Sequence, residues 1–397
     1  MPSLPAQKPS IKVETNHYSL LAARFWHGMP MGTLVKLFRM GKYRNVGPLQ
    51  WPMVGTAWFC SVINSTFGAV QRIRYGKNIE AVTIDEPPLF ILGHWRSGTT
   101  LLHEYLSLDD AHTSPTTYEC FAPAHCLVTK SFIPKLRFLL PDKRPMDNMA
   151  TGWVRPQEDE FALMSMGMPS PYRQIAFPNN PPVDLEYLDF VGVSGEDRRR
   201  WQEMLLWFFK LVTFRSENKR IVVKTPEHLG RVAVLQAMFP EARFVHIVRD
   251  PYKVFPSTIK LWKTLYKIQA YQTPTHEGLE EYVFSCFERM YRQFEQDRRL
   301  IDPSRFHEVR YEDLVADPTG ELESLYARLN LGDFDGVRPK LEEYLQANKD
   351  YQTNRFAMDE SLRAEIDRRW GPWMRPYGYC AESDKVVDTA GTLWLGP

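Results

Sequence analysis

The sequence predicts a three-layer αβα fold with a parallel central sheet, and three observations support this prediction. The chain has 397 residues, 44% hydrophobic and 24% charged, which suits a globular protein with a large core. From residue 88 onward, short β-rich runs alternate with helical stretches, and a glycine-containing turn follows the first run. Such alternation gives parallel strands joined by right-handed crossovers, with ligands at the carboxyl ends of the strands.

The chain ahead of the sheet is predicted to be a disordered lead-in over residues 1–15 and a helical segment over 16–85 packed on the core. Apolar residues recur there at helical spacing, interrupted by Gly-Met-Pro and Gly-Pro. Residues 51–70 form the most apolar window, but Pro52 and several polar residues argue against a membrane-spanning helix. Basic residues beside the apolar positions leave peripheral membrane contact through residues 17–74 as an alternative.

The location of the protein is predicted to be cytoplasmic. Its first residues are polar and contain proline, which does not fit a secretory signal. The five cysteines include no CxxC pair and indicate free thiols in a reducing compartment. A net charge of +1 excludes a global field for nucleic acid, so any affinity for anions must be local.

Residues 86–397 are predicted to form the main domain, which contains four strands. The strands cover 89–92, 221–224, 243–248 and 306–310. Helices are predicted over about 99–108, 229–239, from Pro251 onward, and over 279–300. An insertion around 115–215, rich in proline and methionine, separates the first two strands and is predicted to lie on the substrate side.

The first strand leads into residues 93–100, GHWRSGTT, which have the glycine spacing of a phosphate-binding loop. Backbone N–H groups of such a turn, together with the helix N-terminus, bind an anion. Thr99 replaces the lysine of nucleotide triphosphatases, and no apolar run convincingly ends in an aspartate for magnesium. Arg96 supplies the charge instead. The loop therefore suits an anion held without a metal, such as a sulfuryl group on a nucleotide 5′-phosphate.

A second anion pocket is predicted from residues 246–257, HIVRDPYKVFPS. Arg249 ends a predicted strand, and Ser257 follows two turns into the next helix. A guanidinium and a hydroxyl placed in this way suit a second phosphate, at some distance from the first. Helix capping by the Arg-Asp pair is the alternative interpretation of this segment taken alone.

Together these segments resemble the sulfotransferases that use 3′-phosphoadenosine-5′-phosphosulfate (PAPS), the broad group that includes tyrosylprotein, carbohydrate and bacterial glycolipid sulfotransferases. The resemblance implies a P-loop-type fold, a first motif that wraps the 5′-phosphosulfate and a second that binds the 3′-phosphate. It also covers VVKTPEH at 222–228, which implies Lys224 near the sulfuryl group, and RYEDLVADP at 310–318, which implies a tyrosine near the nucleotide. The implied donor-binding residues are Arg96, Ser97, Gly98, Thr99, Thr100, Arg249, Ser257 and Tyr311.

The base that accepts the proton is predicted to be Glu119. The resemblance implies a glutamate shortly beyond the loop helix, and TTYECFAP at 116–123 provides it, with Arg96 and Lys224 as its cationic neighbours. A carboxylate that caps a turn is the alternative interpretation of Glu119. The other candidate bases are Glu158, Asp159 and Glu160, followed by His94 and His125.

The predicted reaction is transfer of the sulfuryl group from PAPS to a hydroxyl of a lipid, glycolipid, carbohydrate or phenol, with no metal and no nucleic-acid partner. Two departures from the family pattern concern the donor site: Trp95 replaces a common proline, and Leu261 replaces a basic residue. Two other functions stay open, a metal-dependent nucleotide kinase or hydrolase and a nucleotide-binding protein without catalysis.

Overall fold

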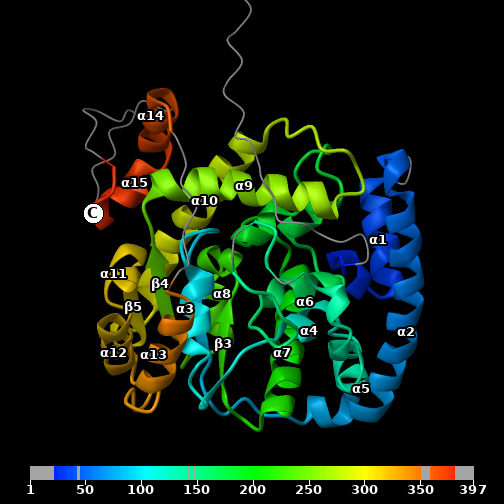
Figure 1. The fold of residues 1–397 in the computed structure, drawn as a ribbon, viewed down its shortest axis with the longest axis horizontal. Coiled ribbons are helices and arrows are strands. Elements are labelled where there is room, and N and C mark those ends of the chain that lie inside the picture. Colours follow the sequence, from blue (N-terminus) through cyan, green and yellow to red (C-terminus); the bar gives the residue numbers. More distant parts are fainter. Residues whose placement is uncertain (1–21, 43–44, 142, 147–148, 350–357, 381–397) are drawn as a thin grey trace, which may run out of the picture.

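In the computed structural model, the protein is described over residues 22–42, 45–141, 143–146, 149–349 and 358–380. The predicted lead-in at 1–15 lies outside these residues. The centre of the molecule is a five-stranded sheet with the order β2-β3-β1-β4-β5 (Figure 1). Its strands are β1 (Leu89–Leu92), β2 (His112–Thr113), β3 (Arg220–Lys224), β4 (Arg243–Val248) and β5 (Phe306–Arg310).

All strand pairs are parallel, and β1 lies in the middle. Leu89 is in register with Val222 on one side and Arg243 on the other, so β3 and β4 end beside β1. The four predicted strands are confirmed, and β2 is a fifth that the sequence does not reveal. Its two residues, His112 and Thr113, are too few and too polar to give the β pattern.

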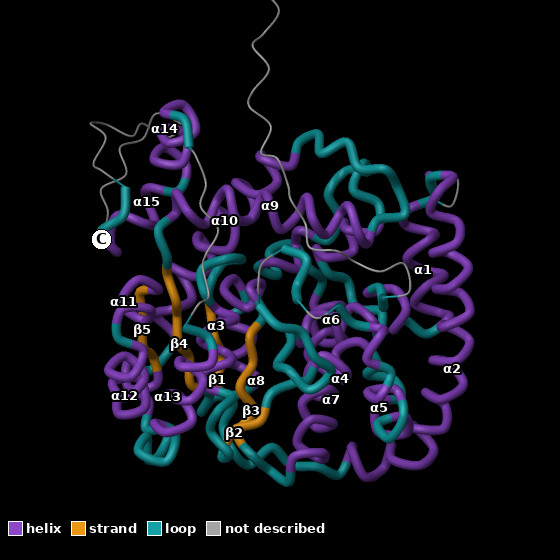
Figure 2. The backbone as a smooth tube through the Cα atoms, in the orientation of Figure 1, coloured by secondary structure: helices purple, strands orange, loops and turns teal. Residues whose placement is uncertain are grey.

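Helices cover both faces of the sheet, as predicted for three layers (Figures 1 and 2). Leu89 and Ile91 point to one core, shared with α3 (Thr99–Leu106), α12 (Pro318–Leu329) and α13 (Arg338–Ala347). Phe90 and Leu92 point to the other core, shared with α7 (Gly195–Ser216), α8 (Val232–Met238) and α10 (Leu279–Asp297). This alternation follows from the two-residue period of a strand, and full burial of β1 explains its unbroken apolar sequence.

The remaining elements surround these layers. The α-helices are α1 (Met31–Gly41), α2 (Trp51–Glu80), α4 (Thr117–Phe121), α5 (Cys126–Thr129), α6 (Asp159–Ser165), α9 (Pro251–Gln269), α11 (Tyr311–Ala316), α14 (Glu360–Arg369) and α15 (Gly371–Met374). The 3-10 helices are η1 (Phe25–Gly28), η3 (Pro48–Gln50), η4 (Ile133–Lys135), η5 (Arg137–Leu139), η6 (Pro171–Ala176), η7 (Leu185–Leu188), η8 (Pro226–Gly230), η9 (Arg298–Leu300), η10 (Pro303–Arg305) and η11 (Arg375–Tyr377).

The helical segment before the sheet forms the edge of the molecule at the right of Figure 1, where α2 packs on α1, α5 and α7. Pro52 does not interrupt the apolar window. Pro52 lies in the first turn of α2, where a missing N–H costs no helical hydrogen bond, so the helix continues for 30 residues. Among the described residues, only residues 48–80 form a helical stretch that could cross a membrane by length and composition, and 22% of its most apolar window is buried.

Candidate active site

A cavity of about 650 Å³ opens at the carboxyl ends of β1, β3 and β4. Its walls bring together residues far apart in the sequence, including Arg96 of the glycine loop, Lys224 at the end of β3 and Arg249 just after β4. The insertion contributes Glu158, and the N-terminal segment contributes Phe25. The position agrees with the rule that ligands of a parallel sheet bind at its strand tips.

The glycine loop joins β1 to the N-terminus of α3. Arg96 has a φ of 69° and Gly98 a φ of 106°, so the backbone turns through the left-handed region twice before the helix begins. The Ser97 hydroxyl donates to the carbonyl of His94 at 2.8 Å and closes the turn. Gly98, Thr99 and Thr100 line the cavity, so the positive end of α3 lies at its wall, as a phosphate-binding site requires.

Gly98 is the position of the loop where substitution is expected to be most damaging. A Cβ atom built there lies 2.3 Å from Cδ2 of Tyr311, and the left-handed φ adds strain. We predict that Gly98→Ala lowers stability by ~2 kcal/mol and weakens nucleotide binding, measured by thermal unfolding and calorimetry. The matched control is Gly55→Ala in α2, where a Cβ meets nothing within 4 Å. The assignment fails if Gly98→Ala behaves like this control.

The predicted residues of the second anion pocket lie beside the loop. The Arg249 guanidinium lies 3.9 Å from the centre of the Tyr311 ring and donates to the backbone carbonyl of Arg96 at 3.0 Å. Nε of Arg96 donates to the hydroxyl of Ser257 at 2.9 Å. Thus Arg96, Arg249, Ser257 and Tyr311, separated by up to 215 positions in the chain, form one contiguous group in the cavity wall.

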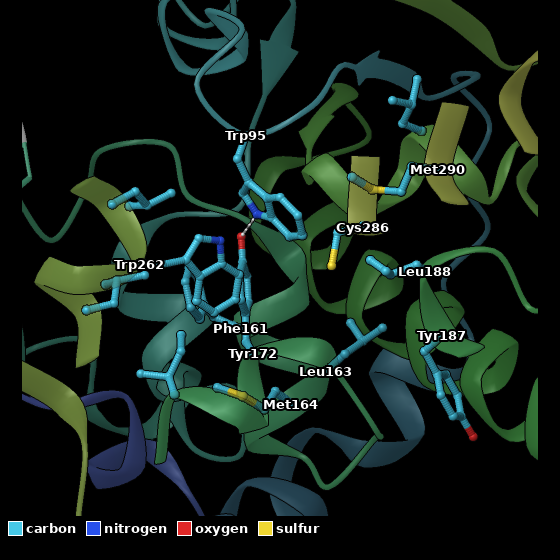
Figure 3. Packing of buried hydrophobic residues seen from close by; sticks show 14 of the residues in the cluster. Trp95, Phe161, Leu163, Met164, Tyr172, Tyr187, Leu188, Trp262, Cys286 and Met290 are labelled. Carbon is cyan, nitrogen blue, oxygen red and sulfur yellow. Dashed lines mark hydrogen bonds between the residues drawn. The ribbon is translucent and has the colours of Figure 1, made fainter. Parts of the chain in front are cut away.

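A chain of hydrogen bonds connects the loop to the Glu158 carboxylate, which lies beside Lys224 at the end of β3. The indole N–H of Trp95 donates to the Tyr172 hydroxyl at 2.8 Å, and this hydroxyl donates to Oε2 of Glu158 at 2.6 Å. The other oxygen of Glu158 accepts from Nζ of Lys224 at 2.5 Å. Figure 3 shows the Trp95–Tyr172 bond within a buried aromatic cluster that includes Phe161.

This chain fixes the orientation of Glu158. Burial, with the Glu158 carboxylate next in effect, raises the pKa of the Tyr172 hydroxyl well above its usual value, so Tyr172 keeps its proton and donates it. The Trp95 side chain is buried, which explains why a large aromatic residue occurs in the loop. The N-cap residue of α6, Glu158, thereby presents one defined carboxylate to the cavity.

The two carboxylates after Glu158 point away from the cavity. Asp159 accepts from the Thr225 hydroxyl at 2.6 Å and contacts Nε2 of His228 at 2.9 Å. Glu160 pairs with the Arg231 guanidinium at 2.6 Å, and both side chains are fully buried. Neither carboxylate lines the cavity. Of the three consecutive acids, only Glu158 is placed to accept a proton there.

Glu119 lies in a different environment from the one predicted for the base. It is the third residue of α4, where Oε2 accepts from the N–H of Thr116 at 2.9 Å and Oε1 accepts from Nε of Arg215 at 2.8 Å. It does not line the cavity, and its cationic partner is Arg215 rather than Arg96 or Lys224. This geometry matches the capping alternative.

The two candidate histidines also lie outside the cavity wall. Burial lowers the pKa of His94 to about 3 and that of His125 to about 4, so both are neutral at pH 7. His125 contacts the Thr129 hydroxyl and the Asn64 side chain. Within the described residues, no group of three or more His, Cys, Asp or Glu is arranged to hold a metal ion.

The sulfotransferase family matches this chain over residues 87–335, which contain all the predicted site residues. Omega-hydroxy-beta-dihydromenaquinone-9 sulfotransferase Stf3 of Mycobacterium bovis is 45% identical over 358 residues, covering 90% of this chain and 92% of the relative. The Mycobacterium tuberculosis Stf3 gives the same values. Two solved structures share the fold at low sequence identity. Sulfotransferase STF9 of Mycobacterium avium has a TM-score of 0.63 and 16% identity, with 91% of this chain and 93% of that chain covered. Sulfotransferase STF1 of M. tuberculosis has a TM-score of 0.59 and 17% identity, with 86% of this chain and 91% of that chain covered.

Proposed function

Because this chain belongs to the sulfotransferase family, we propose that its cavity takes the sulfuryl group from PAPS and transfers it to an apolar alcohol. The single observation that carries the catalytic part is the Lys224–Glu158 pair in the cavity that the glycine loop also lines. It supplies a cation for the leaving oxygen and a carboxylate for the proton within one site.

In the proposed donor complex, the 5′-phosphosulfate lies against the loop and the start of α3. The N–H groups of Ser97 to Thr100, the hydroxyls of Thr99 and Thr100, and the Arg96 guanidinium neutralise it. Arg249 and Ser257 bind the 3′-phosphate, and Tyr311 contacts the nucleotide. Support comes from the contiguity of these side chains in the cavity wall.

The proposed transfer is an in-line displacement at sulfur. The acceptor oxygen forms a bond to sulfur as the bond between sulfur and the 5′-phosphate oxygen breaks, and adenosine 3′,5′-bisphosphate leaves. Glu158 takes the hydroxyl proton, while Lys224 and Arg96 stabilise the charge that grows on the leaving oxygen. We prefer Glu158 to Glu119 as the base because only Glu158 lines the cavity.

The acceptor is proposed to be a lipid alcohol. The cavity wall includes the apolar side chains Phe25, Phe121, Leu140, Met146, Phe161, Leu261, Leu265 and Ile268, together with polar ones such as Glu104, Arg155 and Gln157. A sugar would leave many of its hydroxyls unpaired on such a wall, whereas an alkyl or isoprenoid chain gains from burial. The mycobacterial relatives carry a menaquinone-derived alcohol in their names.

We also propose a cytoplasmic location with peripheral membrane contact through residues 17–74. All five cysteines are free, which agrees with a reducing compartment. A lipid acceptor held in a bilayer makes membrane contact advantageous, because it spares the acceptor a passage through water.

The proposal predicts that labelled PAPS donates sulfate to a long-chain isoprenoid alcohol in a magnesium-free buffer. Transfer to a free monosaccharide should be at least ~10²-fold less efficient in kcat/KM, since the sugar gains nothing from the apolar wall. A radiolabel assay measures both rates. Adenosine 3′,5′-bisphosphate binding without transfer to any alcohol would instead indicate a nucleotide-binding protein, and a magnesium requirement would indicate a kinase-like reaction.

A further inference from the structure

The outer face of α2 carries an apolar surface that no described part of the chain covers. Residues 51, 55, 59, 62, 66, 70 and 73 recur at helical spacing on one side of the helix, and all are exposed. Charged residues appear on this side only at the far end of the helix. We define the α2 surface by its exposed large apolar side chains and those beside them: Met31, Leu49, Trp51, Phe59, Val62, Val70, Ile73, Phe132, Leu136 and Phe138.

These side chains come from three neighbouring segments. The N–H of Met31, at the start of α1, donates to the Ser65 hydroxyl of α2 at 2.9 Å. The Phe132 ring lies 6.3 Å from that of Phe67 on the same helix. Exposure is large at several positions, with Leu49 at 87%, Ile73 at 85% and Phe59 at 69%. A contiguous surface of this kind marks an interaction site rather than scattered exposure.

Basic residues surround this surface, and acidic residues are absent from its sequence. Between Glu14 and Glu80 the chain has eight lysines and arginines but no aspartate or glutamate. Residues 120–141, which contain Phe132, Leu136 and Phe138, also lack acids. The exposed basic side chains are Lys36, Arg39, Lys42, Arg72, Arg74, Lys77, Lys130 and Lys135. Glu80 at the end of α2 is also exposed, but the border as a whole is predominantly basic. Such a surface is complementary to a bilayer that contains anionic lipid.

The inner face of α2 shows that the helix lies on the domain instead of crossing a membrane. The Asn64 amide donates to the backbone carbonyls of His27 and Met29 at 2.6 and 3.1 Å. Gln71 donates to the Pro123 carbonyl at 2.9 Å and accepts from the N–H of Leu127 at 2.8 Å. Both side chains are buried. A helix that spans the membrane would lose these bonds in hydrocarbon. The length of α2 therefore fits a helix that lies parallel to the membrane plane.

The α2 surface is also continuous with the apolar end of the cavity. The N–H of Ala23 donates to the Leu139 carbonyl at 2.7 Å, which joins the N-terminal segment to the chain after Phe138. Phe25, two residues after Ala23, and Leu140, next to Leu139, both line the cavity. From Phe25 an aromatic wall leads inward through Phe161, at 4.5 Å between ring centres. Phe161 stacks at 4.9 Å on Tyr172, the side chain that holds Glu158.

We propose that the α2 surface binds an anionic membrane and that the lipid acceptor enters the cavity from it between Phe25 and Leu140. The route of entry rests on the proposed function, whereas the docking does not. A second copy of the chain fits the surface less well, because a symmetric contact would set its basic border against the same border of the partner. In Figure 1 the α1–α2 edge lies apart from the sheet, so docking there leaves the strand tips accessible.

The test is co-sedimentation of the full chain with vesicles of phosphatidylcholine and phosphatidylglycerol, compared with phosphatidylcholine alone. The wild type should bind the anionic vesicles and be released by high salt. The double variant Phe59→Glu/Ile73→Glu should bind ~10-fold or more weakly, since it places charge in the apolar layer. The control is Leu300→Glu, which changes a side chain that is 58% exposed in η9, outside the surface, and should bind like the wild type.

Calorimetry with adenosine 3′,5′-bisphosphate checks that the variants keep the donor pocket, because no altered side chain lines it. The double variant should also lose turnover on an alcohol embedded in vesicles while keeping turnover on a short, water-soluble alcohol. The docking proposal is overturned if the wild type does not bind anionic vesicles, or if the double variant binds them equally well. It is also overturned if light scattering shows that the wild type is a dimer and the double variant a monomer. Vesicle binding without sulfate transfer to any alcohol would support the docking and count against the proposed acceptor alone.

Discussion

Replacing Glu158 by glutamine is expected to lower kcat by ~10³-fold, because the amide cannot accept the proton of the acceptor hydroxyl. The change preserves shape, and with the amide oxygen toward Tyr172 the buried chain from Trp95 should remain in place, while the bond from Lys224 is lost. Single-turnover transfer of labelled sulfate measures the chemical step, and calorimetry with adenosine 3′,5′-bisphosphate should show nearly unchanged donor-site affinity.

The matched variant is Glu119→Gln. Glu119 caps α4 and pairs with Arg215, so its loss should cost ~1 kcal/mol of stability and leave turnover close to that of the wild type. The two variants change the same functional group at positions 39 residues apart, one in the cavity wall and one outside it. A severe loss of kcat in Glu119→Gln, with normal kcat in Glu158→Gln, would return the role of base to Glu119.

Arg249→Ala is expected to weaken the binding of adenosine 3′,5′-bisphosphate by ~10²-fold and that of AMP much less. The proposed role of Arg249 is to hold the 3′-phosphate through charge-assisted hydrogen bonds, each worth ~1.5–3 kcal/mol, and AMP lacks this phosphate. A smaller loss is expected for AMP, because Arg249 also holds the Arg96 carbonyl of the loop. Calorimetric titration with both nucleotides gives the ratio of the two losses.

Lys253→Ala serves as the control for Arg249→Ala. Lys253 also lines the cavity, but its side chain is 60% exposed and pairs with Asp250. The substitution therefore removes one positive charge only from the rim of the cavity. Lys253→Ala should weaken the binding of both nucleotides only slightly, and this difference should disappear at high salt. Equal losses of AMP and adenosine 3′,5′-bisphosphate in Arg249→Ala would contradict the assignment of the 3′-phosphate.

The strands and the glycine loop could be predicted from the sequence because their signals are local. β1 is buried on both faces, which gives an unbroken apolar run, and the glycine spacing of the loop follows it directly. Helices α9 and α10 also begin at the predicted residues, Pro251 and Leu279. Segments whose sequence pattern strongly favours one secondary structure keep that structure when they pack in the fold.

The proposed base could not be chosen from the sequence, because the choice depends on tertiary contacts. Glu158, Asp159 and Glu160 are adjacent in the chain, yet only the first faces the cavity, while buried partners hold the other two. The partner of Glu158, Tyr172, lies 14 positions away in a segment without a recognisable motif. The effect of Pro52 also depends on its position, because a proline in the first turn of α2 leaves the helix intact.

The Trp95 indole connects the proposed binding sites of the two substrates. The loop proposed to hold the donor and the carboxylate proposed to activate the acceptor are connected through a single phenol, so a displacement of either is transmitted to the other. Replacing Tyr172 alone would leave the Trp95 indole N–H without its acceptor in the interior, whereas replacing Trp95 leaves the Tyr172 hydroxyl bonded to Glu158. A proline at position 95, which the family resemblance implies for relatives, has no indole N–H, so such an enzyme must orient its base through other contacts.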